Sequence, residues 1–172
     1  MDKYTNLAQK AIEIYLKENR LIDPPENLPP EMLEKRAGVF VSIHKKDGSL
    51  RGCIGTFLPT KENIAKEIIS NAISAAFFDP RFFPVQKEEL NDLEISVDIL
   101  SEPEPVESID ELDPKKYGII VKTKNGRTGL LLPDIKGINS INEQISIACQ
   151  KAGIDPVKEK FQIYKFTVKR HK

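Results

Sequence analysis

One short string carries most of the residues in this chain that could do chemistry. Residues 50–55 read LRGCIG and so combine one of only two cysteines with an arginine and two glycines. A cysteine thiolate is a nucleophile, and a neighbouring cation favours the thiolate over the thiol. An arginine guanidinium can bind a carboxylate or a phosphate through two parallel hydrogen bonds. The string therefore predicts a site in which Cys53 is nucleophile or ligand and Arg51 is the anion clamp.

Strand periodicity places this string in a β-hairpin. The alternating run Val39–His44, the turn residues Lys45–Gly48 and the partner run Ser49–Gly55 are typical of two paired strands. Glycines in such a strand leave room for a backbone or a ligand to approach closely. Gly52 and Gly55 are therefore candidate binding positions.

Two turn lengths fit this hairpin, and both give the same parity. With the shorter turn Ser42 faces Cys53 and His44 faces Arg51, whereas the longer turn shifts each partner by two residues along the strand. Either turn puts the following residues on one face: Phe40, Ser42, His44, Arg51, Cys53 and Gly55. The apolar face then carries Val39, Val41, Ile43, Leu50 and Ile54. We therefore expect Cys53 on the more polar face, beside Arg51 and near His44.

The same residues also have a purely structural interpretation. A lone cysteine is most often a small buried apolar residue, and a glycine in a strand often marks a bulge or crowded packing. His44 adjoins a lysine-rich turn and is then an exposed residue. Cys149 shares its predicted helix with Ile145 and is expected in the core or half-buried. Residue spacing alone leaves both interpretations of Cys53 open.

Charged residues elsewhere could complete a site. Asp79 and Arg81 flank Pro80, an arrangement that either presents Arg81 to an anion or closes the end of the preceding helix. Glu94 shares a predicted strand face with Ser96 and Asp98, and this face could orient Arg51 or be solvated. The candidate substrate- or partner-binding residues are thus Gly52, Gly55, Asp79, Arg81, Glu94 and His44.

The elements that must position these residues predict an α+β fold with a mostly antiparallel sheet and flanking helices. Helices are expected over Thr5–Glu18, over a short turn Glu31–Arg36, after Thr60 as N-cap with a Leu58 and Ile64 staple, and from Ser140 towards Gly153. Further strands are expected over Leu93–Leu100, Gly118–Lys122, Arg127–Leu132 and Phe161–Val168. Asn125-Gly126 is the turn of a second hairpin.

Composition limits the function classes. The 172 residues suit one domain, and 26 basic residues balance 26 acidic ones, so no overall field attracts nucleic acid or an anionic membrane. The N-terminal residues lack the apolar run of a signal peptide, and no apolar stretch approaches the length that spans a bilayer. We therefore expect a cytoplasmic protein with two free thiols. The sequence also lacks the paired Cys or His spacing of a metal site.

Several strings in order resemble the AMMECR domain family over nearly the whole chain. The hallmark LRGCIG is intact at residues 50–55. Residues 71–82, residues 93–105, Gly129–Pro133 and Cys149–Gly153 are similar to further family motifs. The resemblance implies an α+β fold with a larger and a smaller subdomain and with the hallmark string lining a cleft between them. It also implies relatives encoded beside, or fused to, a Memo-like protein and a radical-SAM protein.

Two functions follow from these residues and this resemblance. One is an enzyme or enzyme subunit in which Cys53 and Arg51 act on a small anionic or carbonyl substrate, with an unknown cofactor if any. The other is a non-catalytic interaction module that works with a Memo-like or radical-SAM partner, because no base and orienting group are recognisable around the thiol. Full engagement of Arg51 in internal hydrogen bonds would favour the second.

Overall fold

The computed structural model describes residues 2–172 and confirms the α+β fold. The helices are α1 (Lys3–Glu18), α2 (Pro30–Glu34), α3 (Ile64–Phe77) and α4 (Ile141–Ala152), with the short 3-10 helices η1 (Lys87–Asp92) and η2 (Ile109–Glu111). The strands are β1 (Val39–Lys45), β2 (Leu50–Thr56), β3 (Leu93–Leu100), β4 (Glu104–Pro105), β5 (Gly118–Thr123), β6 (Thr128–Leu131), β7 (Phe161–Phe166) and β8 (Val168–His171).

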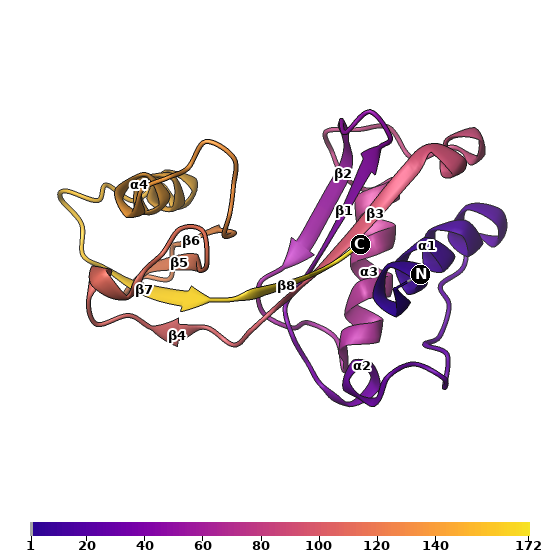
Figure 1. Ribbon diagram of the computed structural model, residues 1–172, viewed down its shortest axis with the longest axis horizontal. Helices are drawn as coiled ribbons and strands as arrows, with labels where there is room; N and C mark the ends of the chain where they lie inside the picture. Colours follow the sequence, from indigo (N-terminus) through magenta and orange to yellow (C-terminus); the bar gives the residue numbers. More distant parts are fainter. Residues whose placement is uncertain (1) are drawn as a thin grey trace. The chain divides into compact units, whose positions relative to one another are not determined.

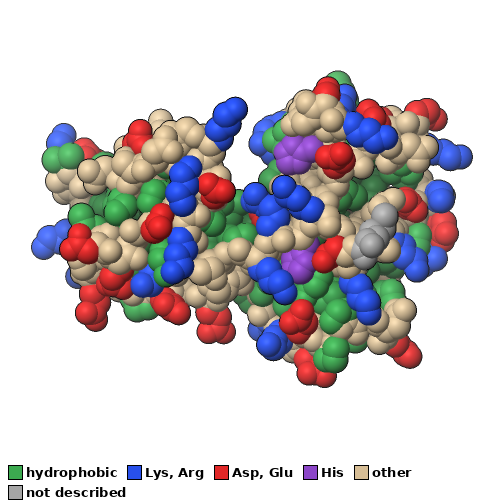
Figure 2. Space-filling view, in the orientation of Figure 1, with side chains coloured by type: hydrophobic (Ala, Val, Ile, Leu, Met, Phe, Trp, Pro, Cys, Tyr) green, Lys and Arg blue, Asp and Glu red, His purple; other side chains and the backbone are tan. Residues whose placement is uncertain are grey.

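The chain divides into two compact units, each with its own sheet and core. Unit 1 runs to Leu100 and regains Lys169–Lys172, and unit 2 is Ser101–Val168. Where one antiparallel sheet was expected, the structure has two four-stranded sheets, one in each unit (Figure 1). No helix within residues 2–172 is long and apolar enough to cross a bilayer. Figure 2 shows acidic and basic side chains interspersed over the visible face.

Unit 1 is a two-layer arrangement of helices on a sheet. Its strand order is β2-β1-β3-β8, with α3 against β1 and β2 and with α1 against α3 and β3 (Figure 1). The predicted apolar face is confirmed for Val39, Val41 and Ile43, which are completely buried against the helices. On the opposite face of this sheet, side chains such as Ser42 and Cys53 are only partly buried. We call that opposite face the open face.

A bulge in β2 changes the predicted parity at Arg51. Ser42 pairs with Cys53 as the shorter turn requires, but His44 pairs with Leu50 because one extra residue is inserted on β2. A bulge of this kind bends the strand and redirects the side chain of the extra residue. Leu50 is therefore exposed instead of joining the core, and Arg51 is buried instead of lying beside His44.

The start of α3 also differs from the prediction. Asn63 is the N-cap and accepts a hydrogen bond from the N–H of Lys66, whereas Thr60 donates to the buried carboxylate of Glu67. Burial opposes ionisation of Glu67, but hydrogen bonds from Thr56, Thr60 and Lys61 outweigh it and lower the pKa of this carboxyl. Glu67 thus fastens the segment between β2 and α3 to the helix.

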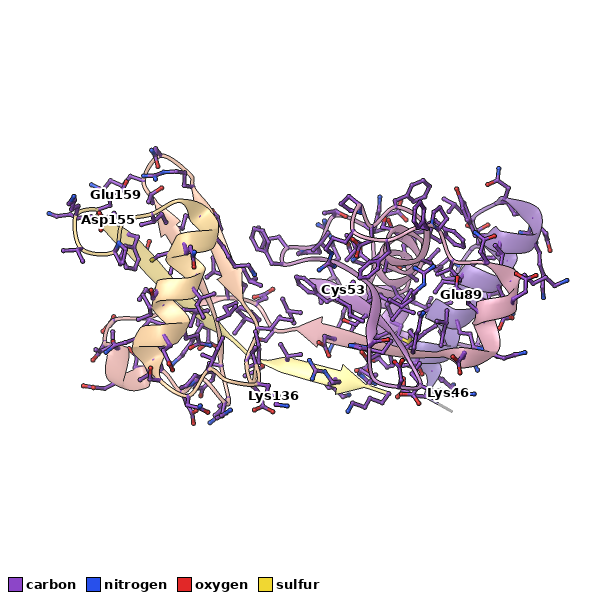
Figure 3. All side chains as sticks on the ribbon, turned by 90° about the horizontal axis from the view of Figure 1, so that it is seen from above. Lys46, Cys53, Glu89, Lys136, Asp155 and Glu159 are labelled. Carbon is purple, nitrogen blue, oxygen red and sulfur yellow. The ribbon has the colours of Figure 1, made fainter. Side chains whose placement is uncertain are left out.

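Unit 2 packs one helix on a sheet of order β4-β7-β5-β6. Ser140 and Glu143 form the predicted capping box at the start of α4, and Gly153 ends the helix in the left-handed conformation. Asp155 and Glu159 lie together in the loop that follows (Figure 3), where the N–H of Asp155 donates to Glu159. The second predicted hairpin is confirmed as β5 and β6.

The last predicted strand serves both sheets. Residues 161–168 alternate as one strand would, yet β7 ends at Phe166 and β8 begins at Val168. Between them Thr167 exchanges hydrogen bonds with Ser101, whose N–H donates to the Thr167 carbonyl and whose hydroxyl accepts from the Thr167 N–H. The chain therefore leaves and re-enters unit 1 at neighbouring residues.

Candidate functional site

The backbone of Cys53 lies at the outer edge of the unit 1 sheet. β2 is an edge strand, and the Ser42–Cys53 pair puts the two side chains next to each other. The N–H of Cys53 donates to Asp79 Oδ2 at 2.9 Å, and its carbonyl accepts from Arg81 Nη2 at 3.1 Å. Both groups therefore point away from β1, which is the geometry of a non-hydrogen-bonded strand pair.

Asp79 and Arg81 act together as a substitute for a neighbouring strand. The Asp79 carboxylate also accepts from Arg81 Nε at 3.0 Å and from Arg81 Nη2 at 2.7 Å. A carboxylate beside a guanidinium thus offers one acceptor and one donor to the free edge at Cys53. Of the two sequence interpretations, the pair closes the end of α3, and it does so by fastening the helix exit to β2.

The electrostatics of this pair favour its charged form. Hydrogen bonds from the Arg81 side chain, helped by the N–H groups of Cys53 and Arg81, hold the pKa of the Asp79 carboxyl far below its usual range despite burial. Asp79 in turn raises the pKa of Arg81. The pair stays ionised at neutral pH although the Asp79 side chain is almost completely buried.

Arg51 is engaged in internal hydrogen bonds. Its Nε donates to Glu89 Oε1 at 2.7 Å and its Nη2 to Glu89 Oε2 at 2.9 Å, which is a bidentate ion pair. Its Nη1 donates to the Phe83 carbonyl at 2.9 Å. The Arg51 side chain is only 10% exposed, and it lowers the pKa of Glu89. Arg51 is thus a positioning residue of the segment after α3, and an anion could reach it only by displacing Glu89.

The two glycines of the hallmark string accommodate parts of the protein itself. A Cβ on Gly52 would lie 2.2 Å from the Ala75 carbonyl oxygen in α3, so this glycine permits the close approach of helix and strand. A Cβ on Gly55 would lie 2.2 Å from the ring of Phe40. Backbone approach is confirmed at Gly52, whereas a side chain and not a ligand fills the space over Gly55.

The Cys53 thiol lies half-buried on the open face. Its hydrogen-bonding neighbour is the Ser42 hydroxyl, with 3.2 Å between Sγ and Oγ. His44 lies further along β1, where it pairs with Leu50 and with Glu94 of β3. A hydroxyl is a poor base at neutral pH, so Ser42 is not a general base for this thiol. Cys149 is buried in unit 2, and burial raises the pKa of its thiol.

Glu94 does not orient Arg51. It lies on β3, which is separated from β2 by β1, and it is exposed. Asp98 on the same strand is buried and makes a bidentate ion pair with Arg170 of β8. Orientation of Arg51 would have required β3 to adjoin β2, and the exposed position of Glu94 agrees instead with the alternative of a solvated face. Within residues 2–172 no group of three His, Cys, Asp or Glu side chains is arranged to hold a metal ion.

The segment that these anchors hold presents aromatic side chains to solvent. We call residues 78–84 the Phe83 loop. Phe83 is 89% exposed and Phe78 is 63% exposed, and the half-exposed Arg81 lies between them in sequence with its guanidinium over the Phe82 ring. Large exposed aromatics next to arginine are the composition of interaction hot spots.

Sequence reasoning missed Glu89 and Phe83. Glu89 lies in η1, a short helix that was not predicted, although Gln86 with Glu89 three residues later is a capping-type spacing. Figure 3 labels Glu89 and Cys53 in unit 1. The available signal for Phe83 is a pair of adjacent phenylalanines between Pro80 and Pro84, in a segment that the two prolines exclude from regular structure.

Comparisons with known proteins cover nearly the whole chain. The AMMECR1 family model matches residues 5–171. A Thermotoga maritima protein is 56% identical over 98% of this chain and 97% of its own length. A Clostridium acetobutylicum protein is 50% identical over 99% of this chain, which spans only 36% of that longer protein. The crystal structure of the uncharacterised protein PH0010 from Pyrococcus horikoshii superposes with a TM-score of 0.86 at 35% identity, covering 97% of this chain and 88% of that one.

Proposed function

The chain belongs to the AMMECR1 family, and we propose that its unit 1 is a protein-interaction module that docks through the Phe83 loop. One observation carries this proposal. The polar groups of the hallmark residues Arg51 and Cys53 that point towards the helix exit are bonded to Phe83, Glu89, Asp79 and Arg81. The hallmark string thus builds and holds the loop.

Rigidity is what distinguishes this loop from an ordinary exposed turn. Besides Arg51 and Asp79, the N–H of Val85 donates to the Ala76 carbonyl at 2.9 Å, and the N–H of Phe82 donates to the Asp79 carbonyl at 3.1 Å. A loop fixed at both ends loses little conformational entropy on binding, and this raises affinity. An exposed phenylalanine on such a loop is suited to fill a pocket on a partner.

The partner that we propose is a Memo-like or radical-SAM protein, the two classes that the family resemblance implies. In the Clostridium acetobutylicum relative the matched segment is 36% of a longer chain, so there it is joined to further sequence in one polypeptide, which is compatible with a fused partner.

The test measures how tightly the two candidate partners bind to this protein. Both partners are encoded in the same genome as this chain and are used in purified form, and this protein is immobilised. Phe83→Ala should weaken binding at least tenfold, because a buried hot-spot aromatic contributes about 2 kcal/mol or more. Val157→Ala is the matched control, since Val157 is 90% exposed in unit 2. Both variants should keep the wild-type unfolding midpoint. Absence of binding to both partners, or equal loss in both variants, would refute the proposal.

An enzyme remains the second candidate, favoured by the Cys53 thiol, which is only half-buried. Its substrate would be a small anionic or carbonyl compound that reaches the open face next to Ser42. Cys53→Ser should then abolish covalent trapping of an electrophilic probe while the fold stays intact. The interaction module predicts instead that Cys53→Ser binds partners as the wild type does, because only the backbone of Cys53 holds the loop.

A further inference from the structure

Unit 2 has a groove along an incompletely paired strand edge. β4 contains only Glu104 and Pro105, which pair with Lys165 and Tyr164 of β7. The first residues of β7 have no strand beside them on that side within residues 2–172. A groove of about 580 Å³ lies there, between the start of β7 and the chain that leaves β4 at Val106–Ile109.

The backbone groups of Phe161 at this edge are unpaired. The Ile163 carbonyl accepts from the N–H of Val106, so Ile163 points its backbone groups towards β4. Alternate residues of a strand point the same way, and the N–H and C=O of Phe161 therefore face the groove. Neither group of Phe161 has a hydrogen-bond partner among the described residues. Such an edge is a template for an additional strand.

The groove also carries an uncompensated positive charge. Lys122, Lys124 and Lys160 line it, all three are exposed, and none forms an ion pair in the described part of the chain. Glu107 is the one carboxylate among the lining residues. The apolar wall includes Phe161, whose side chain packs on the core beneath α4, and Ile109, which is half-exposed.

We propose that this edge binds an extended acidic segment of a partner protein as a strand added to β7. A residue opposite Phe161 would share the face of Phe161 and Thr123 and should be apolar. Its neighbours on either side would share the face of Lys122 and Gln162 and should be acidic. The occupant is therefore a segment that alternates acidic with apolar residues. This inference is independent of the proposed docking of unit 1.

The test measures binding of a fluorescein-labelled peptide to the unaltered protein by fluorescence anisotropy. The peptide alternates glutamate with valine. We expect saturable binding that weakens as the salt concentration rises. N-methylation of the valines should abolish binding, because the N–H groups of residues opposite Phe161 face β7. N-methylation of the glutamates should be tolerated, because their N–H groups face away. Equal effects of the two modifications would overturn strand addition.

Charge variants test the lysines separately. The double variant Lys122→Glu, Lys160→Glu should weaken peptide binding at least tenfold, whereas Lys136→Glu, an exposed lysine of unit 2 outside the groove (Figure 3), should not. A peptide that alternates lysine with valine should not bind. Failure of the acidic peptide to bind would refute the proposal, as would tighter binding of a single-stranded RNA oligonucleotide with the same lysine dependence, which would assign the groove to nucleic acid.

Discussion

The guanidinium of Arg51 holds two separate segments at once, the Glu89 carboxylate in η1 and the Phe83 carbonyl in the loop before it. Removing the guanidinium leaves a carboxylate and a carbonyl without their donor in a mostly buried place. A buried polar group without a partner lowers the free energy of unfolding by more than the intact pair raises it. Position 51 therefore tolerates few substitutions.

Arg51→Ala should therefore lower the free energy of unfolding by about 3 kcal/mol. Arg20→Ala is the control, because Arg20 pairs with Glu18 on the surface with both side chains about half exposed, and such pairs contribute about 0–1 kcal/mol. Urea unfolding of the two variants measures the difference. Equal, small effects would show that Arg51 is not an anchor.

Asp79 predicts a specific acid dependence. Its folded pKa lies below its unfolded value, so its contribution to stability is complete above about pH 4 and is lost as the pH falls towards the folded pKa. Wild type should be more stable than Asp79→Asn at pH 7, and the gap should narrow below pH 4. Unfolding free energies measured across this range check the prediction, and a gap that stays constant would contradict it.

At the scale of elements, the distance between β2 and α3 is set by Gly52. The helix carbonyl of Ala75 occupies the space that any side chain would need, and neither backbone can move without disturbing the sheet or the helix. At Gly48 the constraint is different. A Cβ there would have no heavy atom within 4 Å, but the φ angle is +84°, which residues other than glycine rarely adopt. One glycine is required by packing and the other by backbone conformation.

Gly52→Ala should thus lower the free energy of unfolding by about 3 kcal/mol or more, the upper range for overpacking. It should also weaken partner binding, because it displaces the end of α3. Gly48→Ala should cost only about 1 kcal/mol and leave binding intact. Thermal unfolding and the binding assay distinguish them. Similar costs for both would mean that helix and strand can separate easily at Gly52.

Elements with local signals were predictable, and long-range partners were not. Asn125-Gly126 and the Ser140–Glu143 box act within a few residues, so the second hairpin and α4 agree with expectation. Arg51 and Glu89 are 38 residues apart, and one inserted residue in β2 was enough to reverse the parity at Arg51. The sequence identified residues 50–55 as the candidate site. The role of Arg51 in that site depends on its ion pair with Glu89, which residue spacing does not predict.

At the scale of the whole molecule, unit 2 is an insertion between two strands of one sheet. β3 leaves unit 1 at Leu100, and the chain returns to it at Lys169–Lys172, whose first three residues lie in β8. There Arg170 pairs with Asp98, and His171 stacks on Tyr4 with its Nδ1 2.9 Å from Asp2. The Ser101 and Thr167 hydrogen bonds join the two ends of the insertion.

Replacing residues 102–166 with a short Gly-Ser linker should therefore leave unit 1 folded and cooperative. The same protein with Asp98→Ala should be less stable, because Arg170 would lose its partner on β3. Circular dichroism with thermal unfolding measures both. A linker protein that fails to fold would show that unit 1 depends on unit 2.

The return of β8 also has a consequence for biosynthesis. A ribosome that makes this chain has produced all of unit 2 before it reaches residues 169–172, which complete the sheet of unit 1. Unit 2 is continuous in sequence and can close as soon as it emerges, whereas unit 1 must wait with its β3 edge and the buried Asp98 uncovered. Unit 1, most of which precedes unit 2 in the sequence, is thus completed after it.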